Sequence, residues 1–270
     1  MKIAIALVII AAGLAVLAAV THRDAASSAA TEAEPVEGGR APVVVELFTS
    51  EGCSSCPPAD AVLTRLQETQ PVAGAEIITL SEHVDYWNRL GWADPYSSPQ
   101  FSERQTEYAH VFAKDDVYTP QMVVDGQVEF VGSAMSRAVD AVGKAARRPK
   151  AVVEVTSIET KTDQVKLRVR AEPPPDISEG DAVEVMLAIT ENDLRSSVLR
   201  GENAGRKLSH TAVVRKLEAI GSFAQQSRGT FTAEPVVRLE KEWRPGHLRV
   251  VVFVQERASR RILGAASTGL

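Results

Sequence analysis

Apolar and polar residues follow two different patterns along the chain, and the change falls near residue 149. Before that point, short apolar runs suited to buried strands alternate with stretches whose apolar residues recur at helical spacing. The elements predicted for this part are a strand at 43–48, a helix from Pro57 to the residue before Pro71, a strand at 76–80, a helix at 99–113, a hairpin around Asp125 and Gly126 with strands at 121–124 and 127–131, and a helix at 134–147. The order is that of a βαβαββα domain of the α/β class, which we place at residues 42–149.

Beyond residue 149, apolar and polar residues alternate in short runs that Pro, Gly and Asp clusters separate. Runs with this pattern lie at 151–158, 164–171, 182–190, 211–220, 229–239, 248–256 and 262–267. Strands this short, with no long helix between them, predict an antiparallel β-sandwich. We therefore expect a second, all-β domain at residues 150–270.

The N-terminus carries Lys2 and then an apolar or small-residue run from Ile3 to Val20. One positive charge before such a run is typical of an export signal, and the run is also nearly long enough to cross a bilayer. We expect residues 1–21 to be either a cleaved export signal or a retained membrane anchor. Residues 22–41, rich in Ala, Ser, Glu and Gly, predict a flexible linker. Both alternatives place the rest of the chain in the periplasm or the extracellular space.

The composition is that of a folded protein without a strong charge bias. Hydrophobic residues make up 44% and charged residues 24% of the 270 residues, and 30 Lys and Arg against 35 Asp and Glu give a net charge of -5. This balance offers no basic excess to neutralise a phosphate backbone, so we expect no nucleic-acid partner. Only two cysteines occur, which excludes a small scaffold held together by disulfides.

Cys53 and Cys56 form a Cys-Ser-Ser-Cys motif between the first predicted strand and the first predicted helix. Two intervening residues let the sulfurs meet in a tight disulfide, and the positive end of the helix dipole favours a thiolate at the first cysteine. Such a pair between a strand and a helix is a redox signature of thioredoxin-like folds. A structural disulfide and a metal site are the alternatives. A zinc site would need four ligands, and the sequence has no second cysteine pair.

Pro120 is expected beside the cysteines. In a thioredoxin-like sheet the third strand runs antiparallel beside the first, so a proline at its start lies next to the end of the first strand. That fold implies a cis Thr119–Pro120 bond, whose exposed backbone could pair with an extended substrate segment. The alternative is a trans proline that starts a strand.

His83 ends the second predicted strand and is expected at the same edge of the sheet. There it could transfer protons, stabilise a thiolate or bind a metal together with both sulfurs. The alternative is a structural histidine with hydrogen-bond partners. The polar turn 201–206 has two readings as well: a structural loop packed against the first domain, or a roof over the cysteine site.

The stretch 46–60 closely resembles the opening of domain-of-unknown-function family 1223, secreted bacterial proteins with a thioredoxin-like fold; its sequence is ELFTSEGCSSCPPAD. Further stretches that look like this family are 83–92, Arg104-Gln105, 117–121 and Gly201-Glu202-Asn203 with His210. The resemblance covers residues 42 to 268, and it implies the fold and a location in the cell envelope. Unlike ordinary thioredoxins, the chain has no Trp before Cys53, and Pro57 stands where a basic or polar residue is usual.

We interpret the chain as an exported thiol–disulfide oxidoreductase without cofactor or bound metal, whose redox partner is a protein or a small thiol. Cys53 would project toward solvent as the attacking thiolate, and the more buried Cys56 would resolve the mixed disulfide. Pro120 would shape the substrate groove, and His83 would handle protons. Two alternatives are a copper-handling protein that binds Cu(I) through Cys53, Cys56 and His83, and a non-enzymatic binding module whose disulfide is structural.

Overall fold

Two parallel strands, β1 (Ala41–Thr49) and β2 (Ala75–His83), form the centre of the fold. They belong to a computed structural model that describes residues 39–223 and 229–270. The side chains of β1 are buried on both faces of the sheet, because helices cover both faces of this part. The continuous apolar run at 43–48 is therefore a buried strand, as predicted.

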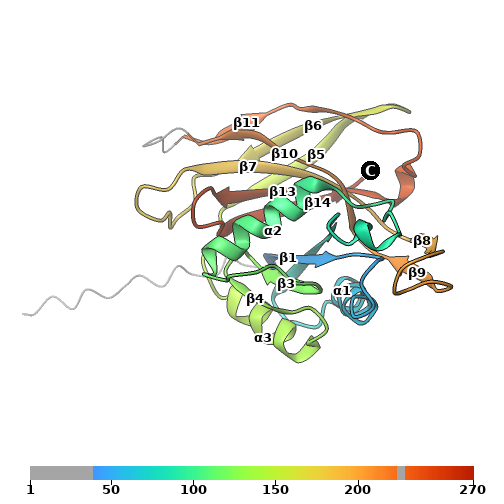
Figure 1. Cartoon of the computed structure of the whole chain (residues 1–270). Coiled ribbons are helices and arrows are strands. Elements are labelled where there is room, and N and C mark those ends of the chain that lie inside the picture. Colours follow the sequence, from blue (N-terminus) through green and yellow to red (C-terminus); the bar gives the residue numbers. More distant parts are fainter. Residues whose placement is uncertain (1–38, 224–228) are drawn as a thin grey trace, which may run out of the picture. The chain divides into compact units, whose positions relative to one another are not determined.

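Helices begin where the sequence supplies start signals. α1 (Pro57–Thr69) opens with two prolines, whose missing N–H groups cost nothing in the first helical turn. α2 (Pro99–Val111) follows Ser98, whose side chain accepts a backbone hydrogen bond at the helix start. α3 (Met135–Ala145) closes this part of the chain. α1 and α3 lie on one side of β1 and α2 lies on the other (Figure 1).

The predicted hairpin continues the sheet beside β1. Its strands are β3 (Gln121–Val124), antiparallel to β1, and β4 (Val128–Val131). Asp125 and Gly126 form the turn with φ values of 47° and 66°, the left-handed conformations that this dipeptide favours. Gly126 is also required for space, because a Cβ there would lie 1.9 Å from the carbonyl oxygen of Arg260.

The sheet does not end at the expected boundary near residue 149. Four strands that are antiparallel to one another extend it on the other side of β2, where β10 runs parallel to β2. They are β7 (Val183–Glu191), β10 (Val213–Ser222), β13 (Leu248–Glu256) and β14 (Ile262–Gly269). The strand order is β14-β13-β7-β10-β2-β1-β3-β4. The junction is short: Val213 of β10 pairs with Ser81 of β2, and the Ser81 N–H donates to the carbonyl oxygen of Ala212 at 2.8 Å.

The described residues on both sides of the expected boundary accordingly belong to one compact unit. The position 149/150 coincides with a change of architecture, since the described residues beyond Ala145 contain strands and one short 3-10 helix, Pro245–His247, but no α-helix. It does not divide the chain into two units. The fold is a mixed α/β sheet with additional antiparallel sheets.

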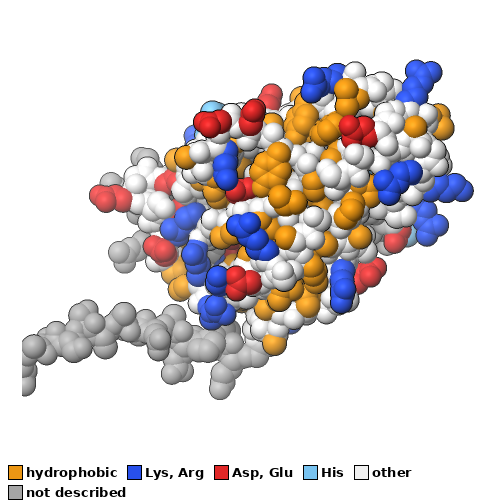
Figure 2. All heavy atoms as spheres, turned by 60° about the horizontal axis from the view of Figure 1, so that its bottom comes forward, with side chains coloured by type: hydrophobic (Ala, Val, Ile, Leu, Met, Phe, Trp, Pro, Cys, Tyr) orange, Lys and Arg blue, Asp and Glu red, His pale blue; other side chains and the backbone are white. Residues whose placement is uncertain are grey.

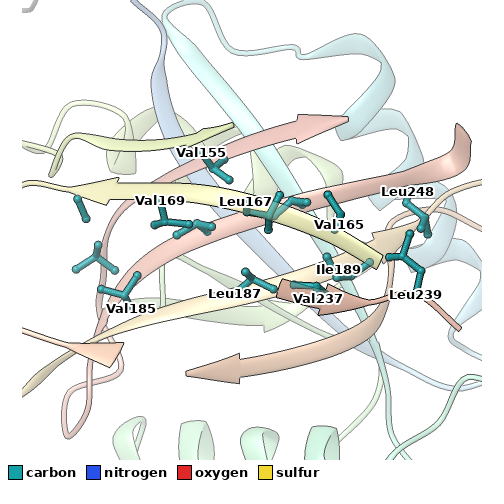
Figure 3. Packing of buried hydrophobic residues seen from close by; sticks show 14 of the residues in the cluster. Val155, Val165, Leu167, Val169, Val185, Leu187, Ile189, Val237, Leu239 and Leu248 are labelled. Atoms are coloured by element: carbon teal, nitrogen blue, oxygen red, sulfur yellow. The ribbon is translucent and has the colours of Figure 1, made fainter. Parts of the chain in front are cut away.

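A second sheet covers the β7 and β13 part of the first. Its strands are β5 (Val153–Thr160), β6 (Gln164–Ala171), β11 (Phe231–Ala233) and β12 (Val236–Arg238). Between the sheets, Val and Leu side chains such as Leu167 and Leu187 interdigitate (Figure 3). The expected sandwich is therefore present, but one of its layers is the extension of the central sheet.

The predicted strand at 229–239 is two strands, β11 and β12, that pair with different parts of β6. Pro235 lies between them and has no N–H to donate to the ladder, while its carbonyl oxygen accepts from Leu167 at 3.0 Å. The proline thus explains the interruption that the alternating pattern did not predict.

A small hairpin was not predicted. Its strands are β8 (Leu194–Ser197) and β9 (Lys207–His210), and they pair as a separate two-stranded sheet. His210 is the last residue of β9, directly before the predicted run at 211–220. Residues 198–206 connect the two strands; we refer to them as the β8–β9 loop.

The expected export signal or anchor at 1–21 lies outside the described residues, and so does the expected linker at 22–41 except for residues 39–41. Ala41 begins β1 rather than ending a linker. Among the residues described here, no helix has both the length and the apolar character needed to cross a bilayer. On the face of the molecule shown in Figure 2, Lys and Arg side chains are interspersed with Asp and Glu, and hydrophobic side chains lie between them.

Candidate functional site

The two cysteines lie in the turn that joins β1 to α1, and they form a disulfide with a Cα–Cα distance of 5.4 Å. Cys56 is the N-cap residue of α1, and its carbonyl oxygen accepts from the N–H groups of Ala59 and Asp60. Neither cysteine is exposed to solvent, at 0% each. The expectation that Cys53 projects toward solvent is therefore wrong for the disulfide form. A disulfide persists in oxidising compartments, so the bond indicates such a location.

The β8–β9 loop covers the cysteine turn. The side-chain Nδ2 of Asn203 donates to the carbonyl oxygens of Glu51 and Cys53, both at 2.9 Å. The neighbouring Glu202 carboxylate accepts from the backbone N–H of Ser54 at 3.0 Å. The polar turn at 201–206 therefore packs against the cysteine turn and covers Cys53, which agrees with both of its readings, the structural loop and the roof over the site.

His83 lies at the end of β2, as predicted, and is held by a residue that the sequence analysis missed. Its Nδ1 is 2.7 Å from Asp94 Oδ2. Burial lowers the pKa of His83, but the carboxylates of Asp94, Asp60 and Glu51 together outweigh burial, so the pKa of the imidazole is raised. Burial raises the pKa of Asp94, but His83 and the N–H groups of Glu51 and Tyr96 overcome that effect and lower it.

A second buried histidine, His210, stands beside the first. Its Nε2 lies 3.0 Å from Glu51 Oε1, and the centroids of the two imidazole rings are 4.8 Å apart. Glu51 also accepts from Trp92 Nε1 at 2.7 Å and from the Ser196 hydroxyl. The hairpin formed by β8 and β9 therefore supplies one imidazole to the site in addition to the loop that covers it.

Asp60 lies in the first turn of α1 and completes a cluster of buried titratable groups. Its carboxylate accepts from Thr49 Oγ1 at 2.8 Å. Burial raises the pKa of Asp60, and the nearby His210 and His83 offset only part of that effect. The group of His83, His210, Glu51, Asp60 and Asp94 is called the histidine–carboxylate cluster below. Within the described structure, His83 Nε2 and His210 Nδ1 are buried without a hydrogen-bond partner.

The Thr119–Pro120 peptide bond is cis, which confirms the prediction, and Pro120 is buried at the start of β3. β3 pairs with β1 so that Gln121 is opposite Phe48, and this register brings the proline beside the end of β1. Trp87 links the two segments. Its Nε1 donates to Thr119 Oγ1 at 2.8 Å, and its Cβ would lie 3.1 Å from a Cβ built on Gly52.

Arg104 and Gln105 lie on α2, which covers the face of β1 opposite to α1 and α3. Arg104 Nε donates to Glu46 Oε1 at 2.6 Å inside a buried polar group. Gln105 Nε2 donates to the carbonyl oxygen of Tyr118 at 2.7 Å, two residues before the cis proline. Arg104 thus stabilises the core, while Gln105 supports the segment that leads to Pro120.

No three or more His, Cys, Asp and Glu side chains in the described parts of the chain are arranged to hold a metal ion. The three residues of the copper alternative have other partners here. Cys53 and Cys56 are bonded to each other, and His83 uses Nδ1 for Asp94.

Four members of the histidine–carboxylate cluster were not predicted as site residues. Glu51 and Asp60 lie within the stretch 46–60, and His210 was part of the resemblance, so a signal existed for these three. Asp94 lies in the aromatic loop between β2 and α2, where the sequence has no periodicity. Only the structure shows that its carboxylate binds His83.

Residues 44–255 match the family "Protein of unknown function (DUF1223)", and the chain belongs to this family. Protein AGR_C_4864 from Agrobacterium tumefaciens has a similar solved structure, with a TM-score of 0.61 and 26% sequence identity; the match covers 84% of this chain and 94% of that one. HBP35 of Porphyromonas gingivalis matches with a TM-score of 0.63 at 16% identity, over 86% of this chain and 76% of its own, and shows the fold alone. No curated protein sequence matches the chain.

Proposed function

We propose that the chain is a thiol–disulfide oxidoreductase whose redox pair is Cys53 and Cys56. The observation that carries the proposal is the disulfide between these residues at the N-terminus of α1, directly after β1 and beside the cis Pro120. The strand order β4-β3-β1-β2, with β3 antiparallel to β1, supports a thioredoxin-like origin for this part of the sheet.

The chemistry is disulfide exchange with a partner dithiol. A partner thiolate attacks Cys53 Sγ, the bond between the two cysteines breaks, and Cys56 leaves as a thiolate. The second partner thiolate then attacks the partner sulfur of the mixed disulfide and releases Cys53. The partner loses two electrons and becomes a disulfide, while both cysteines are reduced. The reverse sequence oxidises the cysteines and reduces the partner.

Proton transfer is the role we assign to the histidine–carboxylate cluster. Each thiolate that leaves or forms at a buried site needs a proton source or acceptor nearby. His83 and Asp60 are buried next to the turn that carries the cysteines, and their pKa values are both raised. Pro120 would form the wall against which the partner segment lies.

The proposed location is the cell envelope. The apolar run from Ile3 to Val20 supports export, and a disulfide is compatible with an oxidising compartment. The partner would then be an exported protein or a small thiol of the same compartment.

The experiment that tests the function is trapping of the mixed disulfide in the native envelope. Cys56→Ser leaves Cys53 able to attack a partner disulfide but unable to release it, so a covalent complex should accumulate. Cells are quenched with acid, and reducible adducts of higher mass are identified. Cys53→Ser and the double variant are the matched controls and should trap nothing. Trapping by Cys53→Ser alone would reverse the assigned roles, and equal trapping by both single variants would show that both thiols are accessible to the partner. No trapping by any variant would contradict exchange.

The complete burial of both sulfurs favours a second candidate, a non-enzymatic binding module in which the disulfide holds the turn between β1 and α1. In that case the bond would resist reduction in the folded protein, and the trapping experiment would give no adducts.

A further inference from the structure

We propose that two residues of the β8–β9 loop control the redox turn: Asn203 positions the backbone around Cys53, and Glu202 disfavours the Cys53 thiolate. The inference deepens the proposed function, because it assigns regulation of the same site to a loop about 150 residues further along the chain.

Asn203 is placed to hold the turn in one conformation. Its side chain is fully buried, and its single Nδ2 group satisfies two carbonyl oxygens of the turn, those of Glu51 and Cys53. Its Oδ1 accepts from Arg206 Nη1 at 2.8 Å, so the amide can face the turn only with its nitrogen. Removing the side chain would leave two buried acceptors without this donor, and the turn would open more readily.

Glu202 places a negative charge where the first thiolate has to form. Its Oε2 accepts from the N–H of Ser54, the residue directly after Cys53, near the positive end of α1. A thiolate at Cys53 would form close to this like charge, which disfavours it. Hydrogen bonds from Ser54 lower the pKa of Glu202, so its carboxylate is ionised at neutral pH.

The other titratable groups around the turn are compensated differently. The members of the histidine–carboxylate cluster pair with one another or with buried donors. On the β8–β9 loop itself, the Arg206 guanidinium donates to Asn203 Oδ1. Among the described residues, Glu202 has no cation within ion-pair distance, since its partner is the Ser54 N–H. Its carboxylate is exposed and lies against the backbone of the residue after Cys53.

The test of Glu202 is a pH titration of thiolate absorbance in the ultraviolet, on the reduced full chain carrying Cys56→Ser so that only Cys53 titrates. Glu202→Gln should lower the midpoint of Cys53 by about half a unit, which raises the thiolate fraction below the midpoint about threefold. Glu68→Gln removes the same charge at the opposite end of α1 and should not move the midpoint. An unchanged or raised midpoint in Glu202→Gln overturns the role of this residue.

Asn203 is tested through the rate at which dithiothreitol reduces the disulfide of the folded full chain. Asn203→Ala should be reduced several-fold faster than the parent, and Asn203→Asp should not restore the slow rate, because it keeps the size but not the donor. An unchanged rate in folded Asn203→Ala overturns the positioning role. If this variant does not fold, Glu202→Gln still decides the thiolate claim. Neither measurement uses a partner, so its failure is distinct from a failure of the trapping experiment.

Discussion

His83 Nδ1 lies 2.7 Å from Asp94 Oδ2, and neither side chain is exposed to solvent. The same carboxylate oxygen accepts from the backbone N–H of Glu51, two residues before Cys53. One aspartate therefore fixes both the imidazole at the end of β2 and the start of the cysteine turn. The position of His83 relative to the redox pair depends on Asp94.

This pair predicts a pH-dependent stability. The folded pKa of His83 is raised, so its stabilisation is complete below the unfolded value of about 6.5 and is lost as pH rises through the folded value. The folded pKa of Asp94 is lowered, so its stabilisation is present above about 3.9 and is lost as pH falls through the folded value. Asp94→Asn should therefore lose most stability relative to the parent between about pH 4 and 6.5, and less above that range.

Urea unfolding at a series of pH values, with the disulfide intact, measures this difference in the free energy of unfolding. Asp193→Asn is the matched control, because Asp193 pairs with His247 at 2.9 Å on the surface, where such pairs contribute little. A deficit of Asp94→Asn that stays constant from acidic to alkaline pH would show that the ionised pair is not what stabilises the site.

Asp60 predicts a pH dependence opposite in sign to that of Asp94. Burial raises its folded pKa, so ionisation of this group destabilises the folded state as pH rises above its usual range. Asp60→Asn keeps an acceptor for Thr49 and removes the buried charge. Relative to the parent, the variant should gain stability as the pH rises from about 4 through the raised folded pKa of Asp60. The same unfolding series measures this gain, and a variant that loses stability over that range would refute the argument.

Gly132 lies where β1, α1 and Pro120 pack together, and this predicts that a side chain at position 132 would not fit. A Cβ at this position would lie 2.6 Å from Leu47 Cδ1, 3.0 Å from Ala59 Cβ and 3.5 Å from Pro120 Cβ. Gly132→Ala should destabilise the protein by about 1–3 kcal/mol, because β1 and α1 have no room to yield. Gly143→Ala, on the more open surface of α3, should be neutral or stabilising by up to about 1 kcal/mol. Thermal unfolding compares them, and equal effects would contradict the packing argument.

The continuous sheet predicts that the described part of the chain unfolds as one unit. Leu187→Ala, in the core between the two sheets, should cost about 2–5 kcal/mol. In a Trp243→Phe background, fluorescence reports on Trp87 and Trp92 near the cysteine turn, far along the chain from Leu187. The fluorescence and circular dichroism transitions should coincide and shift together. Two separate transitions, with only one shifted, would instead support two independent domains.

Much of the local structure could be predicted because its signals are local. The Asp125-Gly126 turn, the double proline at the start of α1 and the apolar run at 43–48 each specify a conformation through a few adjacent residues. The two cysteines and Pro120 could be selected for the same reason, since both signals lie next to a recognisable strand.

What could not be predicted depends on contacts between distant residues. The sheet continues across residue 149 through a pairing of Val213 with Ser81, which leaves no periodic signal in either strand. Asn203, which contacts Cys53, lies in a loop whose sequence indicates only an ordinary polar turn. Asp94 became a site residue only because the chain folds back on the end of β2.

The central claim, that Cys53 and Cys56 are a working redox pair, is tested most directly by their reduction potential. The full chain is equilibrated with defined ratios of reduced and oxidised dithiothreitol, and the fraction of free thiol is measured after acid quenching. An exchange-competent pair should have a potential above about -300 mV, in the range of thiol–disulfide oxidoreductases. A potential well below about -300 mV would identify a structural bridge and contradict the proposed function.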